Sequence, residues 1–514
     1  MKFRFFFFLL FCQFTYAQVV KTVEVDVLGR PSWQQIISLG KNGLVLFIKS
    51  DVTKAKAIRF DSELNKLWET ELFLDAEKQP TAYTVDKELI TFMFSENQGM
   101  YYQVFTLNVN DGKFDYKGFE LREFFQDQDY VYLGNKVLMA GQNDKGAAFY
   151  NFKFNEGFGD FISAYLEGKA QIQYFQLTED KSKIETLWAV KESSYTNEKK
   201  KKGEFIKDAF TIYAVYDTTG QRLTSIKIAS KAGSFPLTAK AIKQNEIIKA
   251  ITGTYQANNG TKGLYIALIE NGQNTLTNFY SYNQLLAGEP SLKEEDIKKI
   301  ADSFVFFPTE PIYNNNQISI GGSFVRAEYQ TISQNNGSYY DPYGRTYDPY
   351  NRYGRFGGTN PRTSSKQVFK GFNFLLGIAA TFDLSGQLIR QKRIDMNHFS
   401  LQIVENLAIT PQSSFAYVTK GNIAVGYLNL GASPILYKLS NDKSENKNIA
   451  YIPNYQGVRY WFDNFLIADG SRLKVEPIKD DLPVKQDNKK KKKSTSNPPQ
   501  ANIRKIIYLS KIAG

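Results

Sequence analysis

A hairpin that recurs along the chain limits most strongly how this sequence can fold. Its clearest copy is FTIYAVYDTTGQRLTSIKI at Phe210–Ile228, where an alternating apolar strand ends at Asp217 and a more polar strand begins at Arg222. Gly220 lies in the turn, where it can adopt the positive φ that tight hairpin turns require. Six other segments repeat this order of strand, Asp- or Asn-containing turn, and strand, with turns that begin near residues 61, 110, 155, 271, 383 and 441. The chain is therefore predicted to be a series of similar β units.

The spacing of the turns predicts the size of the unit. Most neighbouring turns lie about 45–62 residues apart, and a further apolar run precedes the hairpins, as expected for units of four strands with ~40–50 residues each. The interval from Asn271 to Asp383 is about twice as long. It contains Ser291–Asp302, whose Ser cap and early acidic residues predict a short helix, and the low-complexity loop Glu328–Lys366. Without these two insertions the interval has the length of the others.

The two ends of the chain are predicted to meet in one unit. The last apolar segment, Ile503–Ile512, stops where an eighth turn is expected. The missing outer strand can come from Val19–Leu28 at the other end of the chain. Such a closure leaves no open sheet edge that would invite aggregation.

The repeated strand–(Asp/Asn)-x-x-Gly–strand unit resembles that of the β-propeller superfamily, in particular WD40-like and PQQ-like propellers. The regular Gly-His and Trp-Asp pairs of WD40 repeats are missing, so no specific family is indicated. We expect an all-β fold, a single β-propeller of about eight four-stranded blades over 18–514, with seven blades as the alternative. Two stacked β-sandwich domains are the competing architecture, but they do not require a constant repeat period.

The N-terminus has the pattern of a cleaved signal peptide over residues 1–17. Lys2 and Arg4 precede the short apolar run Phe5–Phe11, and Thr15 and Ala17 place small residues before a cleavage site at Gln18. We therefore expect an exported protein that is periplasmic or associated with the outer membrane. Lipidation at Cys12 is not expected, because a small residue would have to precede that cysteine and Phe11 is large.

Few residues of this sequence can support catalysis or bind a metal. Cys12 is the only cysteine and is lost with the signal peptide, and His398 is the only histidine. A zinc site needs several such ligands, and a Ser-His-Asp arrangement could be built only on His398, which we interpret as a connector residue between two units. We expect no metal, no cofactor, no nucleic-acid partner and no enzymatic activity. The acidic residues in turns should close their own backbone loops; these residues are Asp61, Asp111, Glu156, Asp217 and Asp383.

Lysine runs mark two of the three predicted inserted loops. The net charge is +12, and part of it is concentrated in loops 192–208 and 480–502. Such runs are either solvated loops or sites that attract an anionic membrane surface or a polyanionic glycan. The residues are Lys199, Lys200, Lys201, Lys202, Lys489, Lys490, Lys491, Lys492 and Lys493.

The third predicted loop, 328–366, contains the most distinctive segment, Gly337–Arg362, with the near-repeat YDPYGR and YDPYNR. Tyrosine and arginine suit an adaptable contact surface, since both combine stacking with hydrogen bonding. The alternative is an insertion that has no partner. The candidate contact residues are Tyr339, Tyr340, Tyr343, Arg345, Tyr347, Tyr350, Arg352, Tyr353 and Arg355.

These observations predict an exported, non-enzymatic β-propeller that acts as a protein-binding scaffold in the bacterial cell envelope. By architecture it is similar to propeller subunits of outer-membrane assembly machines, which implies other envelope proteins as partners. The alternative is a propeller that binds or cleaves polysaccharide through carboxylates in the central channel. Two or more inward-facing carboxylates clustered within glycosidase distance at the channel mouth, with aromatic residues beside them, would favour cleavage of polysaccharide, whereas a channel of Ser, Thr and apolar residues would oppose it. The oligomeric state is left open.

Overall fold

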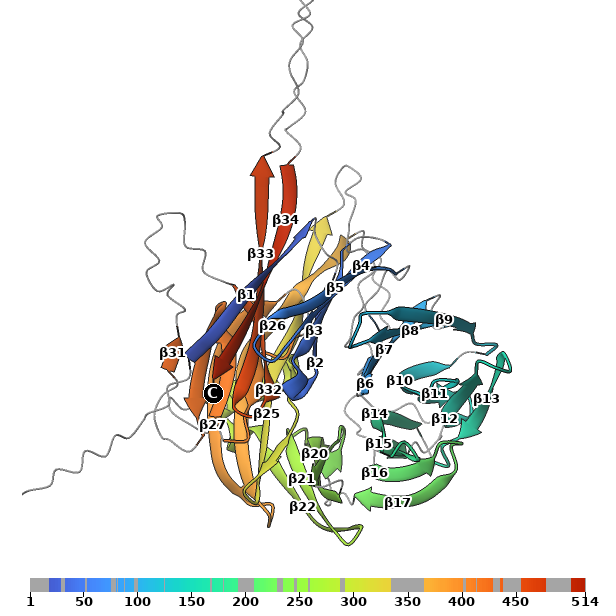
Figure 1. The fold of residues 1–514 in the computed structure, drawn as a ribbon. Coiled ribbons are helices and arrows are strands. Elements are labelled where there is room, and N and C mark those ends of the chain that lie inside the picture. Colours follow the sequence, from blue (N-terminus) through green and yellow to red (C-terminus); the bar gives the residue numbers. More distant parts are fainter. Residues whose placement is uncertain are drawn as a thin grey trace, which may run out of the picture.

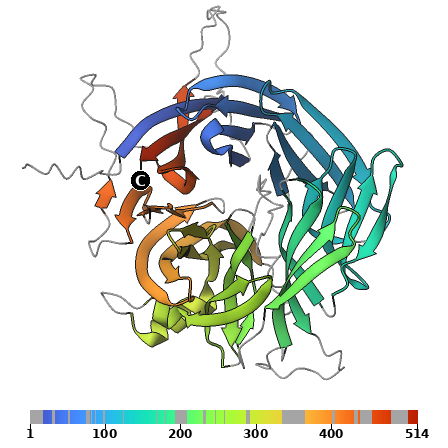
Figure 2. The same ribbon diagram turned by 60° about the horizontal axis from the view of Figure 1, so that its bottom comes forward.

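The computed structural model shows eight antiparallel sheets arranged as the blades of a ring (Figures 1 and 2). It describes residues 18–28, 33–50, 53–74, 80, 82–86, 88–96, 100–123, 125–166, 169–178, 180–192, 208–228, 234–244, 247–257, 259–286, 292–333, 365–400, 404–412, 414–428, 435–437, 454–477 and 501–513. The predicted β-propeller is therefore confirmed, with eight blades rather than the alternative seven.

The first three blades each contain four strands that follow one another from the centre of the ring outward. Blade 1 consists of β2 (Trp33–Ser38), β3 (Leu44–Lys49), β4 (Lys54–Phe60) and β5 (Lys66–Phe73), with a 3₁₀ turn at Gly40–Asn42. Blade 2 consists of β6 (Ala82–Asp86), β7 (Leu89–Glu96), β8 (Tyr101–Asn108) and β9 (Phe114–Glu120). Blade 3 consists of β10 (Gln126–Tyr132), β11 (Lys136–Asn143), β12 (Gly146–Lys153) and β13 (Phe158–Ser163).

The next three blades repeat this order, with a divided inner strand in two of them. Blade 4 consists of β14 (Lys169–Leu177), β15 (Lys183–Glu192), β16 (Asp208–Asp217) and β17 (Arg222–Ile228). Blade 5 has β18 (Ser234–Pro236) and β19 (Lys240–Gln244) beside β20 (Ile247–Ala257), then β21 (Lys262–Glu270) and β22 (Gln273–Ser281). Blade 6 has β23 (Val305–Pro308) and β24 (Ile312–Asn314) beside β25 (Gln317–Ser333), then β26 (Ser365–Asp383) and β27 (Leu388–Ser400).

The last two blades complete the ring. Blade 7 consists of β28 (Leu407–Ile409), β29 (Ser414–Thr419), β30 (Asn422–Tyr427) and β31 (Ile435–Tyr437). Blade 8 consists of β32 (Tyr455–Phe462), β33 (Phe465–Pro477), β34 (Ala501–Ala513) and, as its outermost strand, β1 (Gln18–Leu28) from the start of the chain.

The predicted closure of the ring by the N-terminal strand is confirmed. β1 pairs antiparallel with β34, from Gln18 opposite Ala513 to Leu28 opposite Arg504. Val25 and Val27 on β1 are buried in an apolar cluster that also contains residues of blade 1. Both chain ends therefore contribute to the same sheet.

Apolar clusters hold neighbouring blades together. Eight such clusters lie among the described residues, one in each of the eight spaces between adjacent blades. Each middle strand packs against the blades on both sides of its own blade, so both of its faces are buried. All six residues of β3, for example, are buried. The outer strands face solvent, and most of β17 is exposed. This arrangement explains why the sequence of a middle strand such as β3 is continuously apolar, whereas that of an outer strand such as β17 is polar.

Four of the five predicted acidic turn residues, Asp61, Asp111, Asp217 and Asp383, close their own loops, whereas the Glu156 carboxylate pairs with Lys153 at 3.1 Å instead. Asp217 Oδ1 accepts the backbone N–H groups of Thr219 and Gln221 at 2.8 and 2.9 Å. Asp383 accepts those of Ser385 and Gln387 at the same distances. The turn of blade 1 has the same hydrogen bonds around Asp61, although Leu64, with φ 55°, occupies the place that glycine takes in the other two turns.

Two helices lie between blades 5 and 6, and one of them was predicted. α2 (Glu294–Ser303) starts later than the predicted Ser291, because its first turn is formed by three consecutive acidic residues. α1 (Tyr282–Leu285) was not predicted; a capping box between Ser281 and Gln284 starts it directly at the end of β22. Both helices pack on the cluster between blades 5 and 6.

The predicted loop 328–366 is shorter than expected at both ends. β25 continues to Ser333 and β26 begins at Ser365, so residues 328–333 and 365–366 are strand. An aromatic pair stabilises this extension of the two strands. The ring of Tyr329 on β25 packs edge-on against that of Phe369 on β26, with 5.6 Å between the ring centroids. The other two predicted loops begin and end close to their expected positions, since β15 ends at Glu192 and β34 begins at Ala501.

Candidate functional site

Three hairpins carry the predicted insertions, and all three leave the ring on one face. They are β15–β16, β25–β26 and β33–β34, the second and third strands of blades 4, 6 and 8. Strand direction alternates within a blade and every blade runs from the centre outward, so all second-to-third connections lie on the same face of the ring. The last described pairs of these hairpins are Glu192–Asp208, Ser333–Ser365 and Pro477–Ala501. We call this side of the ring the hairpin face.

The candidate contact residues of the sequence fall within these three insertions and lie outside the described residues. This holds for the nine Tyr and Arg residues of Gly337–Arg362 and for both lysine runs, Lys199–Lys202 and Lys489–Lys493. The structure places the strands that flank them. The β25–β26 ladder, with strands of 17 and 19 residues, is the longest of the three.

A polar cluster in the central channel was not predicted residue by residue. We call it the channel cluster: Gln35 on β2, Tyr83 on β6, Glu310 between β23 and β24, Glu405 before β28, and Arg459 on β32. These positions belong to the innermost strands, or their connections, of blades 1, 2, 6, 7 and 8. Blades 2 and 6 are opposite each other in a ring of eight, so the cluster draws its members from both sides of the ring.

Two hydrogen bonds fix the side chain of Arg459 in the channel cluster. Arg459 Nη2 donates to Asp469 Oδ1 at 2.7 Å, and Arg459 Nη1 donates to the carbonyl of Ile36 at 3.4 Å. The carbonyl of Glu405 accepts the N–H of Val458, the residue before Arg459, at 2.8 Å. These bonds hold the Arg459 guanidinium close to the chain at Glu405.

The charged members of the cluster influence the pKa of Tyr83. Burial raises the pKa of Tyr83 above 10.0, and the negative charges of Glu405 and Glu310 raise it further, while Arg459 and a hydrogen bond with Gln35 act in the opposite direction. The side chain of Tyr83 is nevertheless 39% exposed. The phenol of Tyr83 therefore stays protonated at neutral pH.

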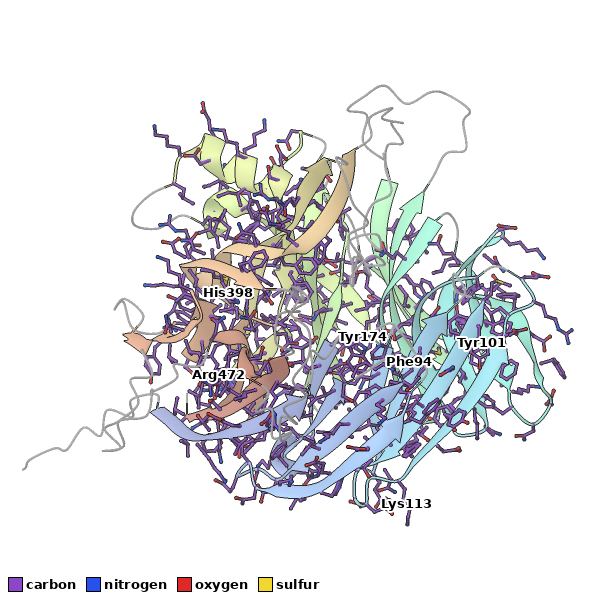
Figure 3. The ribbon with its side chains drawn as sticks, turned by 90° about the horizontal axis from the view of Figure 1, so that it is seen from above. Phe94, Tyr101, Lys113, Tyr174, His398 and Arg472 are labelled. Carbon is purple, nitrogen blue, oxygen red and sulfur yellow. The ribbon has the colours of Figure 1, made fainter. Side chains whose placement is uncertain are left out.

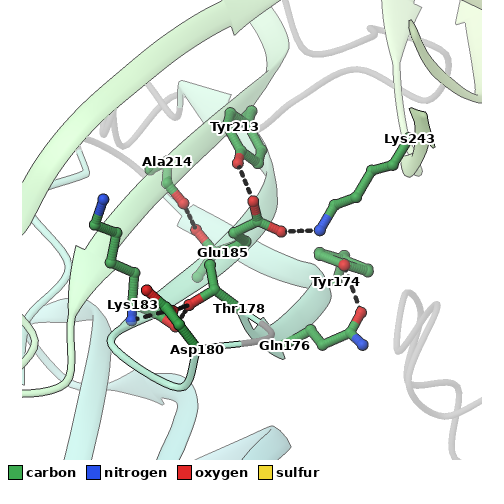
Figure 4. A network of polar contacts seen from close by, with 10 residues as sticks. Tyr174, Gln176, Thr178, Asp180, Lys183, Glu185, Tyr213, Ala214 and Lys243 are labelled. Atoms are coloured by element: carbon green, nitrogen blue, oxygen red, sulfur yellow. Dashed lines mark hydrogen bonds and ion pairs between the residues drawn. The ribbon is translucent and has the colours of Figure 1, made fainter. Parts of the chain in front are cut away.

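A second polar network joins blades 4 and 5 (Figure 4). Tyr213 donates to Glu185 Oε1 at 2.8 Å, and Lys243 forms an ion pair with the other carboxylate oxygen of Glu185. Burial acts to lower the pKa of Lys243, but the hydrogen bond to Glu185 and the nearby Tyr174 outweigh it and raise this pKa. Tyr174 belongs to the inner strand β14 and lies near the middle of the molecule, whereas Lys113 lies at its edge (Figure 3). The network therefore fixes the channel side of these two blades.

His398 is a buried residue of strand β27, not of a connector as the sequence indicated. Its side chain is 3% exposed, and its Nε2 lies 3.2 Å from the carbonyl of Gln456 on β32. Burial lowers the pKa of His398 below 6.5, although the hydrogen bond to Gln456 acts against this change. The contact links blade 6 to blade 8, which is a structural role.

The part of the chain that the structure describes contains no group of three or more His, Cys, Asp and Glu residues able to hold a metal ion. No helix in the same part combines the length and apolar character needed to cross a bilayer. No distance between carboxylates on the inner strands of the described residues tests the glycan alternative, which stays a prediction.

Comparisons with known proteins give only distant structural similarities. No protein-family model and no curated protein matches this sequence. The chain is similar to the crystal structure of the tricorn protease (9% identity, TM-score 0.37, 80% of this chain and 36% of that chain). It is also similar to the polysaccharide lyase Uly1 (9% identity, TM-score 0.36, 88% of this chain and 92% of that chain). A third similar structure is a Synechocystis apocarotenoid oxygenase mutant (7% identity, TM-score 0.32, 49% of this chain and 62% of that chain).

The chain thus spans less than two thirds of the tricorn protease and of the oxygenase. TM-scores below 0.5 carry no argument about activity. The β-propeller assignment therefore depends on the strand pairing of the eight blades.

Proposed function

We propose that this protein is an exported, non-enzymatic scaffold of the bacterial cell envelope that binds other envelope proteins. One observation supports this proposal above the others: the three hairpins with insertions share the hairpin face. Three separate segments can then contact one partner, and each contact adds to the same interface.

The ring is suited to this role because it holds the hairpins in fixed positions. Every space between adjacent blades contains an apolar cluster, and β1 closes the last blade. Binding residues are often carried by loops on such a rigid framework. The insertions of blades 4 and 8 add positive charge, and that of blade 6 adds tyrosine and arginine. An interface of this composition fits an acidic protein surface.

Affinity isolation from crosslinked envelopes tests the proposal. Wild-type protein is compared with a variant in which Gly337–Arg362 is replaced by a Gly/Ser segment of equal length, which keeps the hairpin and removes its side chains. The matched control is Tyr116→Ser, an exposed aromatic residue of outer strand β9. We expect a reproducible partner with the wild type and the control, and its loss with the replacement. Identical partners for all three proteins would refute a role for this segment.

Determining the N-terminal residue of the protein isolated from cells tests export separately. We expect the mature chain to begin at Gln18, which is the first paired residue of β1. A chain that retains Met1 and stays in the cytoplasm would contradict the proposal whatever it binds.

A further inference from the structure

The turn of blade 1 between β4 and β5 differs from the matching turns of blades 4 and 6 at one position. Leu64 has φ 55° there, whereas Gly220 and Gly386 hold the same hydrogen-bonded place in the other two turns. This conformation costs free energy for a residue with a Cβ atom. The Leu64 side chain is buried in the apolar cluster between blades 8 and 1. The strained residue therefore anchors its turn to the blade that contains both chain ends.

The residues on either side of Leu64 bond to the strands from the two ends of the chain. Glu63 Oε1 accepts a hydrogen bond from Lys511 Nζ of β34 at 2.6 Å. Asn65 Oδ1 accepts one from Lys21 Nζ of β1, also at 2.6 Å. These three consecutive residues of the turn, which we call the closing latch, therefore contact both strands that the chain ends contribute to blade 8.

The burial of Lys511 gives its ion pair with Glu63 particular importance. The Lys511 side chain is 2% exposed, and its Nζ lies 4.0 Å from the centroid of the Phe465 ring. The Glu63 side chain is 60% exposed. Loss of the carboxylate would leave a buried ammonium group without its counter-charge, which is strongly unfavourable. It would therefore favour movement of β34 away from blade 1, because such movement exposes the ammonium group to water.

We propose that the closing latch is a conformational lock, which holds both chain ends against blade 1 and whose release lets β1 detach locally. β1 is the outermost strand of its sheet, and β34 is its neighbour there. It can therefore separate while the other blades stay folded. Third-to-fourth connections lie on the opposite face of the ring from second-to-third connections. The latch is thus distant from the hairpin face, and its opening is independent of the partner contacts proposed there.

Hydrogen–deuterium exchange measured by mass spectrometry on the chain that begins at Gln18 tests the latch. Glu63→Gln removes the charge of the pair, and Leu64→Gly removes the buried side chain while it relieves the positive φ. We expect each variant to accelerate amide exchange in β1 by at least about 10-fold and to leave β20 and β21 of blade 5 unchanged. The matched control is Glu69→Gln, which breaks the ion pair with Lys56 inside blade 1 and should leave exchange in β1 unchanged.

Leu64→Gly is the sharper test, because the two possible roles of this residue predict opposite effects. If Leu64 only completed its turn, glycine would fit the positive φ better and exchange would stay equal or become slower. If Leu64 anchors blade 8, exchange in β1 becomes faster. Should Leu64→Gly fail to fold, Glu63→Gln decides the question, since it changes an exposed side chain.

Three results would overturn the inference. The first is unchanged or slower exchange of β1 in either folded latch variant. The second is equal acceleration in β1 and in blade 5, which would report unfolding of the whole ring. The third is an effect of Glu69→Gln on β1 as large as that of Glu63→Gln.

Discussion

Replacing Val25 and Val27 by alanine tests whether the N-terminal strand holds the ring closed. Both side chains are buried, with 9% and 3% of their surface exposed, and both belong to the cluster between blades 8 and 1. Each Val→Ala change removes two carbon groups, which is ~1.6 kcal/mol per site at ~0.8 kcal/mol per buried CH₂. Partly unfilled cavities add to this loss. We therefore expect the double variant to lower the free energy of unfolding by about 3–4 kcal/mol.

Urea denaturation followed by tryptophan fluorescence measures this change. The matched control is Val20→Ala on the same strand, where the side chain is 51% exposed and the expected change is below ~0.5 kcal/mol. The midpoint of the double variant should shift to lower urea while the slope stays constant. A double variant that loses less than about 1 kcal/mol, or no more than the control, would refute the idea that burial of β1 stabilises the ring.

Three other perturbations test single features of the fold. Burial lowers the pKa of His398 below 6.5, so this side chain binds a proton more readily in the unfolded chain than in the folded protein. The stability that neutral His398 contributes is complete above pH 6.5 and is lost below it, by up to about 1.4 kcal/mol per pH unit. His398→Phe should flatten this pH dependence, which urea titrations from pH 5 to 8 measure. Asp383→Ala removes the acceptor of two turn N–H groups and should cost about 1–2 kcal/mol in thermal denaturation, with a smaller loss for Asp383→Asn, which keeps an acceptor oxygen. Glu185→Gln leaves the partly buried Lys243 without its counter-charge and should lower the free energy of unfolding by about 3 kcal/mol. In a double-mutant cycle, adding Lys243→Met should restore part of this stability. Equal losses of stability for the single and double variants would argue against coupling of the pair.

The fold could be predicted best from the sequence where the same short turn motif repeats. Asp217 and Asp383 close the same turn with the same hydrogen bonds, so the motif could be found without knowledge of the fold. The repeat count then predicted eight blades, and the absence of a final outer strand predicted the pairing of β1 with β34. Deviations such as Leu64 at a positive φ do not disrupt this pattern, because the Asp61 carboxylate makes the same bonds there.

The channel cluster could not be predicted in the same way. Its members lie singly on inner strands or their connections, in five blades from Gln35 to Arg459, and each is a common polar residue without a local motif. They belong to one region of the molecule only because the blades are arranged in a ring. α1 escaped prediction for another reason: a four-residue helix has too few positions to show a helical period, and its start depends on one capping box.

The location of both chain ends in one sheet also determines when this protein can finish folding. Among the described strands, β1 is synthesised first and its partner β34 is synthesised last, so β1 cannot pair until all the strands between them have been made. Until then Val25 and Val27 have no sheet to join, and a contact of such sequence separation forms slowly. A chain interrupted before β34 would lack a complete eighth blade and expose strand edges prone to aggregation. The same adjacency of Gln18 and Ala513 makes the ring a natural substrate for circular permutation, with the ends joined and new ends opened elsewhere.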